Sequence, residues 1–287
     1  MSAPSNGTPG DGSGRRVLVT GGASGLGAAL VRRFAARGDR VIATDLAEHA
    51  PDALPPGVAY LRLDVTSDHD WANALTRVED LWGGLDVLVN NAGIAAGGRI
   101  DVLTLDDWRS ITDVNLFGVV RGCRTFAPLF KGQGSGHVVN VASMAGLVHP
   151  PVMSSYNAVK AAVVALSETL RHELAPYGVT TSVVCPSFFR TGLASSLSGS
   201  DPEVEASATR LIDGSRLSAE DVAARVLRGV DRRRPVILTD RAGRTALRAK
   251  RWLRPLYDLA MRRVAEGVRR RVDPASLTAD HPTENRV

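Results

Sequence analysis

Apolar segments of strand length alternate with helical patterns along most of the chain, and this alternation restricts the possible folds more than any other feature. Seven such segments are rich in Val and Ile and show little alternation of polarity, as strands buried on both faces do. They are Arg16–Thr20, Arg40–Asp45, Ala59–Val65, Leu85–Gly93, Gly136–Ser143, Val179–Pro186 and Pro235–Asp240. Helical patterns lie between nearly all of them, at Gly25–Gly38, Asp68–Trp82, Leu105–Phe130, Ser155–Tyr177 and Ala219–Arg228. The pattern predicts an α/β fold with a doubly wound parallel sheet of about seven strands, sandwiched between two layers of helices.

The two ends of the chain differ from this body, for which one domain over residues 15–240 is expected. Residues 1–14 are rich in Gly, Ser and Pro and are predicted to form a disordered tail, and residues 273–287 a flexible one. The start lacks the apolar segment of a secretory signal, and no run approaches the roughly 20 apolar residues of a membrane span. Two cysteines are too few for a disulfide framework. These observations favour a cytoplasmic protein in a reducing compartment.

Residues 241–272 account for the net positive charge of the chain. Eleven Arg and Lys residues against two acids give this segment a charge of +9, whereas the whole chain carries +5. Its apolar residues form one helical stripe opposite an arginine-rich face; they are Leu253, Leu256, Tyr257, Ala260, Met261, Val264 and Val268. Three interpretations of this basic amphipathic extension are open: packing on its own body or a partner subunit, peripheral contact with a membrane surface, and binding of an anionic substrate carrier. Nucleic acid fits poorly, because no recognition motif accompanies the charge.

A glycine-rich turn joins the first predicted strand to the first helix. It reads Thr-Gly-x-x-x-Gly-x-Gly, with Gly21, Gly25 and Gly27 at the glycine positions. Glycines permit positive φ and let backbone N–H groups approach a pyrophosphate, to which the helix N-terminus adds partial positive charge. Asp45 ends the second strand, where a carboxylate can accept hydrogen bonds from both adenosine ribose hydroxyls and repel the extra phosphate of NADP. Because no basic residue stands in the turn or directly after Asp45, the sequence predicts a dinucleotide site that prefers NAD, with NADP as the alternative.

Tyr156 and Lys160 are four residues apart in a helical pattern and therefore share one helix face. An ammonium group beside a phenol is expected to lower the pKa of the tyrosine from its usual value of about 10. Such a tyrosine can exchange a proton with a carbonyl or alcohol oxygen near neutral pH. Taken alone, the spacing is also typical of a solvated pair on a helix surface.

Further polar motifs stand at the ends of the predicted strands. They are LDV (Leu63–Val65), NNAG (Asn90–Gly93), NVASMAG with Ser143, and CPSFFRT (Cys185–Thr191), and DVNLFG with Asn115 lies in the next long helix. The carboxyl edge of an open α/β sheet is where ligands bind. In order and spacing, these motifs together with the glycine turn and Tyr156–Lys160 resemble the short-chain dehydrogenase/reductase family, in its short single-domain branch. The resemblance extends from about Arg16 to about Asp240 and implies a Rossmann-type fold.

The resemblance also implies roles for single residues. Tyr156 would be the general acid and base, and Ser143 would hold the substrate oxygen beside it. Lys160 would lower the Tyr156 pKa and bind the nicotinamide ribose, and Asn115 would anchor a water that connects Lys160 with solvent. Cofactor contacts are implied for Gly21, Ser24, Gly25, Leu26, Gly27, Asp45, Leu46, Asp64, Val65, Asn91, Ala92, Gly93, Tyr156, Lys160, Pro186 and Thr191. One departure is Ser187, where the family usually has glycine; serine fits there unless the backbone needs positive φ.

The activity implied is an NAD(P)-dependent oxidoreductase that interconverts a secondary alcohol and a ketone by hydride transfer, with no metal site expected. Substrate contacts are expected from Ser143, Ala145, Met153, Tyr156, Phe188 and Phe189, and they favour an apolar small molecule under a lid of residues 191–215. A homodimer or homotetramer built on the helices of Leu105–Phe130 and Ser155–Tyr177 is expected from the family. Two alternatives remain: an NADP-dependent carbonyl or 3-oxoacyl-type reductase, and a non-catalytic NAD-binding regulatory protein.

Overall fold

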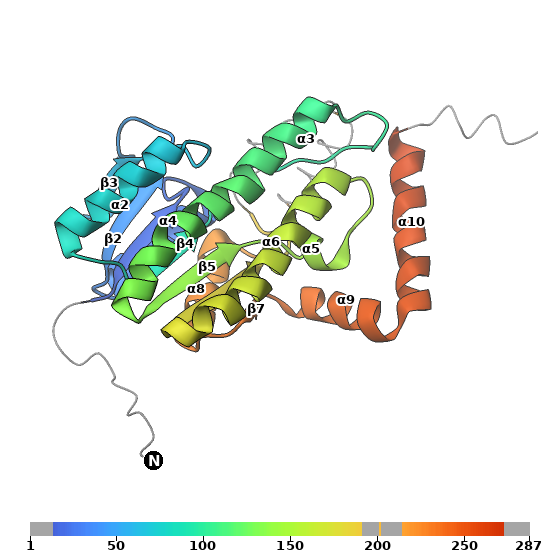
Figure 1. Ribbon diagram of the computed structural model, residues 1–287. Helices are drawn as coiled ribbons and strands as arrows, with labels where there is room; N and C mark the ends of the chain where they lie inside the picture. The colour runs from blue at the N-terminus through green and yellow to red at the C-terminus, as the bar shows by residue number, and fades with distance from the viewer. Residues whose placement is uncertain (1–13, 191–200, 202–213, 273–287) are drawn as a thin grey trace, which may run out of the picture.

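A sheet of seven parallel strands forms the centre of the molecule, with helices on both of its faces (Figure 1). The computed structural model describes residues 14–190, 201 and 214–272. The strand order is β3-β2-β1-β4-β5-β6-β7, and the strands are β1 (Arg16–Thr20), β2 (Arg40–Asp45), β3 (Ala59–Arg62), β4 (Val87–Asn90), β5 (Gly136–Val141), β6 (Val179–Cys185) and β7 (Val236–Leu238). The predicted doubly wound sheet is therefore confirmed.

The helices divide into two layers. Side chains of α1 and α8 pack on one face of the sheet, and those of α2, α4 and α6 pack on the other. The helical elements are α1 (Gly25–Ala36), α2 (Asp68–Trp82), α3 (Leu105–Thr112), the π-helical turn η1 (Asp113–Phe117), α4 (Gly118–Gln133), α5 (Ala145–Val148), α6 (Ser154–Leu174), the 3-10 turn η2 (Ala175–Tyr177), α8 (Ala219–Asp231), α9 (Arg241–Trp252) and α10 (Arg254–Val272).

The chain reverses its direction of travel across the sheet between β1 and β4. Strands β2 and β3 extend the sheet on one side of β1, and β4 to β7 extend it on the other. Loops on the two sides of such a point diverge and leave a crevice at the carboxyl ends of the strands. Several strands end earlier than the sequence pattern predicts, since β3 stops at Arg62 and β4 at Asn90. The polar residues that follow them belong to this crevice.

His137 lies in β5, buried within the sheet at the edge opposite the crevice, and its Nε2 is 2.7 Å from the Ser182 hydroxyl of β6. Burial lowers the pKa of His137 from 6.5 to about 4. Between these two pH values the unfolded chain binds a proton that the folded chain does not, so stability should fall as the pH falls from 6.5 to 4, by up to ~3 kcal/mol. Urea unfolding at neutral and acid pH measures this loss. It should be smaller in His137→Gln, and an unchanged loss in that variant would exclude His137 as its source.

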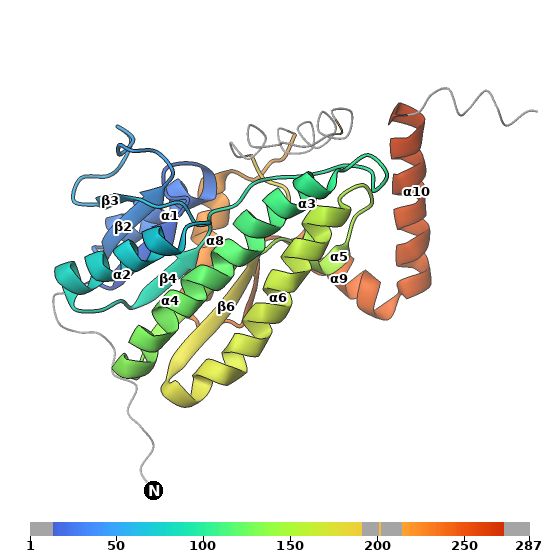
Figure 2. The same ribbon diagram turned by 45° about the horizontal axis from the view of Figure 1, so that its top comes forward.

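The C-terminal segment forms two helices rather than one. Helix α9 ends at Trp252 and α10 begins at Arg254 with Pro255 in its first turn, the position where a residue without an N–H is tolerated. Helix α10 stands at the end of the molecule opposite β2 and β3 (Figures 1 and 2). Tyr257 is buried against the body, whereas Leu256 and Val264 are exposed. The extension thus packs in part on its own domain, and contact with a membrane surface stays a prediction.

Two further expectations concern surfaces. Leu105 and Phe117 are exposed on the α3–η1–α4 face. The sequence predicts that this face forms the interface of a homo-oligomer, and that interface stays a prediction. Among the helices that the structure describes, none is both long and apolar enough to cross a membrane.

Candidate active site

The glycine turn between β1 and α1 has the geometry of an anion cradle. Gly21 and Gly25 have φ values of 63° and 53°, in the left-handed region that favours glycine. A Cβ on Gly27 would lie 1.9 Å from the Gly21 carbonyl oxygen, so only glycine fits there. Ser24 is the N-cap of α1, but its side chain makes no capping hydrogen bond. The N–H groups of the first helical turn are therefore available to a phosphate.

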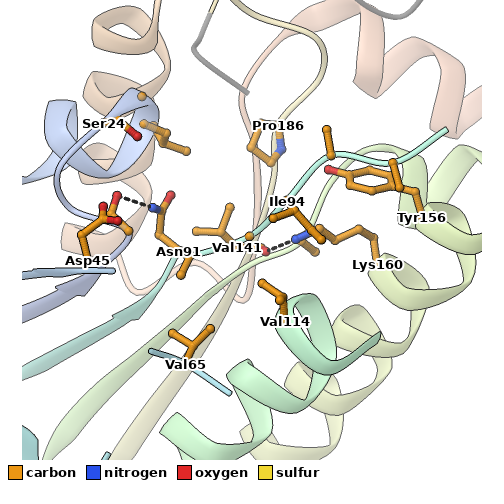
Figure 3. Close-up of a pocket in the computed structure, with 18 of the residues that line it drawn as sticks. Ser24, Asp45, Val65, Asn91, Ile94, Val114, Val141, Tyr156, Lys160 and Pro186 are labelled. Carbon is orange, nitrogen blue, oxygen red and sulfur yellow. Dashed lines mark hydrogen bonds between the residues drawn. The ribbon is translucent and has the colours of Figure 1, made fainter. Parts of the chain in front are cut away.

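A cavity of about 350 Å³ extends from this turn across the crevice to Tyr156 (Figure 3). Most residues predicted from the sequence line it: Gly21, Ser24, Gly25, Leu26, Asp45, Leu46, Asp64, Val65, Asn91, Ala92, Gly93, Met153, Tyr156, Lys160, Pro186, Phe188 and Phe189. Sequence reasoning missed other lining residues, which are Leu63, Ile94, Ala95, Ala96, Val114, Val141, Ala142 and Ser187. Most of these are apolar. Leu63, Val114, Val141 and Ala142 lie within the motifs quoted above, and Ile94, Ala95 and Ala96 directly follow NNAG, so the motifs indicated the region but not these contacts.

Four predicted residues lie beside the cavity rather than in its wall. Gly27 packs closely against the Gly21 carbonyl group. Asn115 and Ala145 are buried, and the Ser143 hydroxyl lies next to the Tyr156 phenol. Ala145 packs with Tyr156 in a small apolar cluster, and its contact with substrate stays a prediction. Thr191 falls outside the described residues, as does most of the predicted lid.

Asp45 and Tyr156 mark opposite ends of the cavity (Figure 3). The Asp45 carboxylate accepts hydrogen bonds from the backbone N–H groups of Ala23, at 3.0 Å, and Leu46, at 2.8 Å. These bonds hold the carboxylate beside the glycine turn. Among the described residues that line the cavity, Lys160 is the only basic one, and it lies at the Tyr156 end.

Asn91 and Thr20 fix the floor of the cavity. The Thr20 hydroxyl accepts hydrogen bonds from the N–H groups of Asn91 and Ala92, both at 3.0 Å. The Asn91 amide in turn donates to the Thr20 and Gly21 carbonyl oxygens, at 2.9 and 3.3 Å. The Asn91 side chain therefore joins the end of β4 to the glycine turn, a positioning role that the sequence motif did not indicate.

Asn115 lies in the π-helical turn η1, and such turns are often found at functional sites. Its amide exchanges two hydrogen bonds with the backbone of Ile94, each 2.8 Å long. A Cβ on Gly93 would lie 2.7 Å from Asn115 Oδ1 and 3.7 Å from Lys160 Nζ. Asn115 thus holds the chain after β4 close to Lys160. Its predicted role in anchoring a water stays a prediction.

The electrostatics of Tyr156 differ from the prediction. The phenol is buried in the first turns of α6, and burial raises its pKa above 10, an effect that the adjacent Ser143 hydroxyl partly opposes. Lys160 Nζ donates to the Val141 carbonyl oxygen at 3.1 Å (Figure 3) and lies 5.7 Å from the centre of the Tyr156 ring. Burial lowers the pKa of Lys160 to about 8. The pKa of Tyr156 therefore lies above its usual value and not below it as predicted, because desolvation is the largest influence on the buried phenol.

The loop before Tyr156 is held by unusual contacts. Val152 has a φ of 56°, which is strained for a β-branched residue, and its carbonyl accepts from the Gly98 N–H at 2.8 Å. On the other side, Lys250 of α9 donates to the Leu147 carbonyl at 2.6 Å, and Tyr257 of α10 donates to the Val148 carbonyl. The C-terminal extension therefore supports the segment that carries Met153 into the cavity. Sequence reasoning recognised the helices but not these contacts.

Ser187 fits its position without strain. The φ of Ser187 is not in the positive region. Its hydroxyl packs toward Gly243 of α9, and a Cβ added to Gly243 would lie 2.9 Å from the Ser187 Oγ. The replacement of the usual glycine therefore does not disturb the cavity wall.

Asp201 lies inside the predicted lid, residues 191–215, of which the structure also describes residues 214 and 215, and it is buried. Its carboxylate accepts from Arg99 at the backbone N, at Nε and at Nη2, over 3.0, 2.8 and 3.2 Å. Hydrogen bonds to a charged group contribute about 1.5–3 kcal/mol, and Arg99→Met removes the side-chain hydrogen bonds to the buried Asp201 while the backbone one stays. Arg99→Met should lower the free energy of unfolding by about that amount, as measured in urea. Arg109→Met is the matched control, because its ion pair with Asp106 is exposed and should contribute less than about 1 kcal/mol. Equal losses in the two variants would show that the Arg99–Asp201 pair contributes no more to stability than an exposed pair does.

The residues present fit a nicotinamide dinucleotide. The glycine turn and the N-terminus of α1 suit a pyrophosphate, Asp45 suits the adenosine ribose, and Tyr156, Ser143 and Lys160 converge at the far end. No group of three or more His, Cys, Asp and Glu residues in the described part of the chain could hold a metal ion.

Comparisons with known proteins agree with this geometry. A 3-alpha-(or 20-beta)-hydroxysteroid dehydrogenase of Mycobacterium tuberculosis is 37% identical over 182 residues, which cover 62% of this chain and 70% of the relative. A short-chain dehydrogenase/reductase of Burkholderia phymatum, solved in complex with NAD, has a TM-score of 0.77 and 33% identity, over 82% of this chain and 92% of that one. A short-chain dehydrogenase of Burkholderia cenocepacia, solved in complex with NADP, has a TM-score of 0.74 and 25% identity, over 87% and 98%.

The sequence profile of the family described as short chain dehydrogenase matches residues 15–201. With the profile, the fold and the cavity in agreement, the chain belongs to the short-chain dehydrogenase/reductase family and is an NAD(P)-dependent oxidoreductase that acts on CH–OH groups.

Proposed function

We propose that the protein interconverts an apolar secondary alcohol and its ketone, with NAD preferred over NADP. The observation that carries this proposal is a single cavity with a carboxylate at the adenosine end and a buried Tyr156 with Ser143 at an apolar end. Phe188, Phe189 and Met153 line that apolar end. The relation to a hydroxysteroid dehydrogenase supports a substrate with an apolar carbon skeleton.

Tyr156 and Ser143 act together on the substrate oxygen. In reduction, the Tyr156 phenol donates its proton to the ketone oxygen while the Ser143 hydroxyl donates a hydrogen bond to the same atom. When bound, the nicotinamide supplies the hydride in reduction and accepts it in oxidation. Because burial keeps the pKa of Tyr156 above 10, the phenol is protonated at neutral pH and suited to act as the acid. In oxidation, the phenolate takes the alcohol proton, so this direction should be favoured by higher pH.

The position of Lys160 suits contact with both the nicotinamide ribose and the Tyr156 phenol. Its pKa of about 8 leaves it largely protonated at neutral pH, and its bond to the Val141 carbonyl holds it below Tyr156. Asn115 and Gly93 limit the space around the ammonium. From this position Lys160 can donate hydrogen bonds to a ribose and stabilise a phenolate that forms on Tyr156 during turnover.

Asp45 supports the NAD preference. Its carboxylate, fixed by the Ala23 and Leu46 N–H groups, can accept from ribose hydroxyls and repels a 2′-phosphate. A phosphate there would find no compensating charge, since the only basic residue in the described cavity wall is at the other end. The alternative, an NADP-dependent carbonyl or 3-oxoacyl-type reductase, would require such a charge.

The ratio of kcat/KM for NAD to that for NADP tests the preference. We expect at least about a tenfold ratio in favour of NAD, equivalent to about 1.4 kcal/mol, because the carboxylate attracts one cofactor and repels the other. Asp45→Ser should reduce the ratio by a similar factor. Asp52→Ser, in an exposed loop, is the control and should leave the ratio unchanged. A wild-type ratio of one or below would support the NADP-dependent alternative instead.

A further inference from the structure

A second hollow, of about 440 Å³, lies between α8, β7 and the start of α9 and shares no residue with the active-site cavity. Six of the ten residues that line it are arginines: Arg225, Arg228, Arg232, Arg234, Arg241 and Arg244. We call these six residues the arginine hollow. No acid lines it, and none of its arginines forms a salt bridge with an acid of the described chain. The Asp221 carboxylate, whose pKa is lowered by hydrogen bonds from Ser218 and by the charge of Arg225, forms the capping box of α8 with that serine.

The secondary structure brings these guanidinium groups together. Arg225, Arg228 and Arg232 follow one another at helical spacing and share one face of α8 and its C-cap. Arg241 and Arg244 lie one turn apart at the start of α9. Like charges this close repel one another, so the cluster costs stability unless something compensates it.

The start of α9 is charged against its own dipole. Acids stabilise the first turn of a helix and cations destabilise it. The first turn of α9 contains no acid but carries Arg241, and Arg244 follows. The neighbouring Asp240 caps the helix through the Gly243 N–H, at 2.6 Å, and does not line the hollow. An external anion would reverse this unfavourable arrangement.

Thr239 supplies an independent observation. Its side chain is 2% exposed, it lines the hollow, and its hydroxyl has no hydrogen-bond partner in the protein. Its carbonyl oxygen accepts a hydrogen bond from Arg225 Nη1, which fixes that guanidinium at the Thr239 backbone. Buried hydroxyls without a partner are uncommon and are often satisfied by a ligand or water.

We propose that the arginine hollow binds a phosphate-bearing polyanion. Guanidinium groups match phosphate oxygens with two parallel hydrogen bonds, and several of them can neutralise a group with two or more negative charges. The volume admits more than one phosphate group. The same chemistry is presented by a free diphosphate and by the phosphomonoester headgroup of a lipid.

A structural reason for the cluster must be distinguished from this proposal. β7 pairs only with β6 and is an edge strand, and charged side chains protect such edges from pairing with other chains. Protection requires charge alone, so lysines would serve equally well. A phosphate site depends on the planar fork of arginine and should lose affinity when lysine replaces it.

Calorimetric titration of the full chain with inorganic diphosphate tests whether the hollow binds a free phosphate compound. Saturating NAD is present, so that the glycine turn does not compete for the probe. The hollow variant is Arg228→Gln/Arg232→Gln/Arg244→Gln, and the control is Arg248→Gln/Arg262→Gln/Arg263→Gln, which removes the same charge from exposed positions on α9 and α10. We expect one diphosphate per chain, affinity within about twofold of wild type in the control, and a loss of at least about tenfold in the hollow variant, as expected when paired contacts are removed. The triple Arg→Lys exchange at the hollow positions should also weaken binding.

Sedimentation with phosphatidylcholine vesicles that contain phosphatidic acid tests whether the hollow binds the phosphomonoester headgroup of a lipid. Binding that is lost in the hollow variant and kept in the control would assign the hollow to a lipid headgroup. Diphosphate binding with the same pattern would assign it to a free phosphate compound. If neither probe binds, or if the hollow and control variants bind equally, the proposal is overturned and edge protection remains. Thermal unfolding verifies that both variants fold.

Discussion

Replacing Tyr156 with phenylalanine should lower kcat by about 10³-fold or more, with cofactor affinity changed little. General acid–base catalysis typically contributes 10²–10⁴-fold, and Tyr156 is the described residue that can deliver a proton at the apolar end of the cavity, since Lys160 is turned to the Val141 carbonyl. The ring itself packs with Ala145 and Val159 and keeps these contacts in phenylalanine. Steady-state kinetics gives kcat, and equilibrium titration with NADH gives the affinity.

Tyr177→Phe is the matched control. Tyr177 is exposed on the turn η2, where its hydroxyl has no catalytic neighbour in the structure, and its loss should leave kcat unchanged. A Tyr156→Phe variant with the kcat of wild type would show that the proton comes from elsewhere. Equal inactivation by both substitutions would point to a general loss of structure.

Gly27→Ala should abolish measurable cofactor binding, a loss of at least about 100-fold, or about 2.7 kcal/mol. The added Cβ would lie 1.9 Å from the Gly21 carbonyl oxygen and 2.6 Å from the Asn91 amide nitrogen. Neither neighbour can move away easily. The Gly21 oxygen belongs to the backbone of the turn, where Gly21 has a positive φ, and the Asn91 amide donates a hydrogen bond to the Thr20 carbonyl oxygen. The turn must therefore open, and the backbone N–H groups in the first turn of α1 would no longer point together at a bound phosphate.

Gly132→Ala separates this effect from a generic response to a methyl group. Gly132 lies in α4, and a Cβ there meets nothing within 4 Å. Alanine in the last turn of a helix should be neutral or stabilising by less than about 1 kcal/mol. NADH titration and thermal unfolding of both variants provide the comparison. Unchanged affinity in Gly27→Ala would mean that the turn does not bind the cofactor.

Much of the fold and of the cavity could be predicted from the sequence for physical reasons. Strands buried on both faces read as continuous apolar runs, so all seven were recognised. The side chains that follow such strands meet at one edge of the sheet, and this placed Asp45 and Asn91 in one site, to which the family resemblance added Tyr156. Strand order could not be read from local patterns, since it depends on pairing between distant segments.

The parts that sequence reasoning missed depend on side-chain direction and on long-range contacts. Lys160 has the predicted spacing from Tyr156, yet its ammonium binds the Val141 carbonyl, and no spacing rule indicates that choice. Asn115 acts on the Ile94 backbone through a π-helical turn that looks like ordinary helix in sequence. Lys250 reaches the loop before Tyr156 from about a hundred residues further along the chain. The arginine hollow likewise unites α8 and α9 only in the folded molecule.

The central claim is that the Tyr156 end of the cavity transfers hydride and proton between NADH and an apolar ketone. It is tested most directly by following NADH absorbance when the wild-type chain and Tyr156→Phe are mixed with NADH and a panel of apolar secondary ketones. The account predicts saturable loss of NADH with equal formation of alcohol for at least one ketone in wild type, and none in Tyr156→Phe. Oxidation of NADH at the same rate by both proteins would contradict it, as would a wild-type chain that binds NADH but leaves it unoxidised with every ketone.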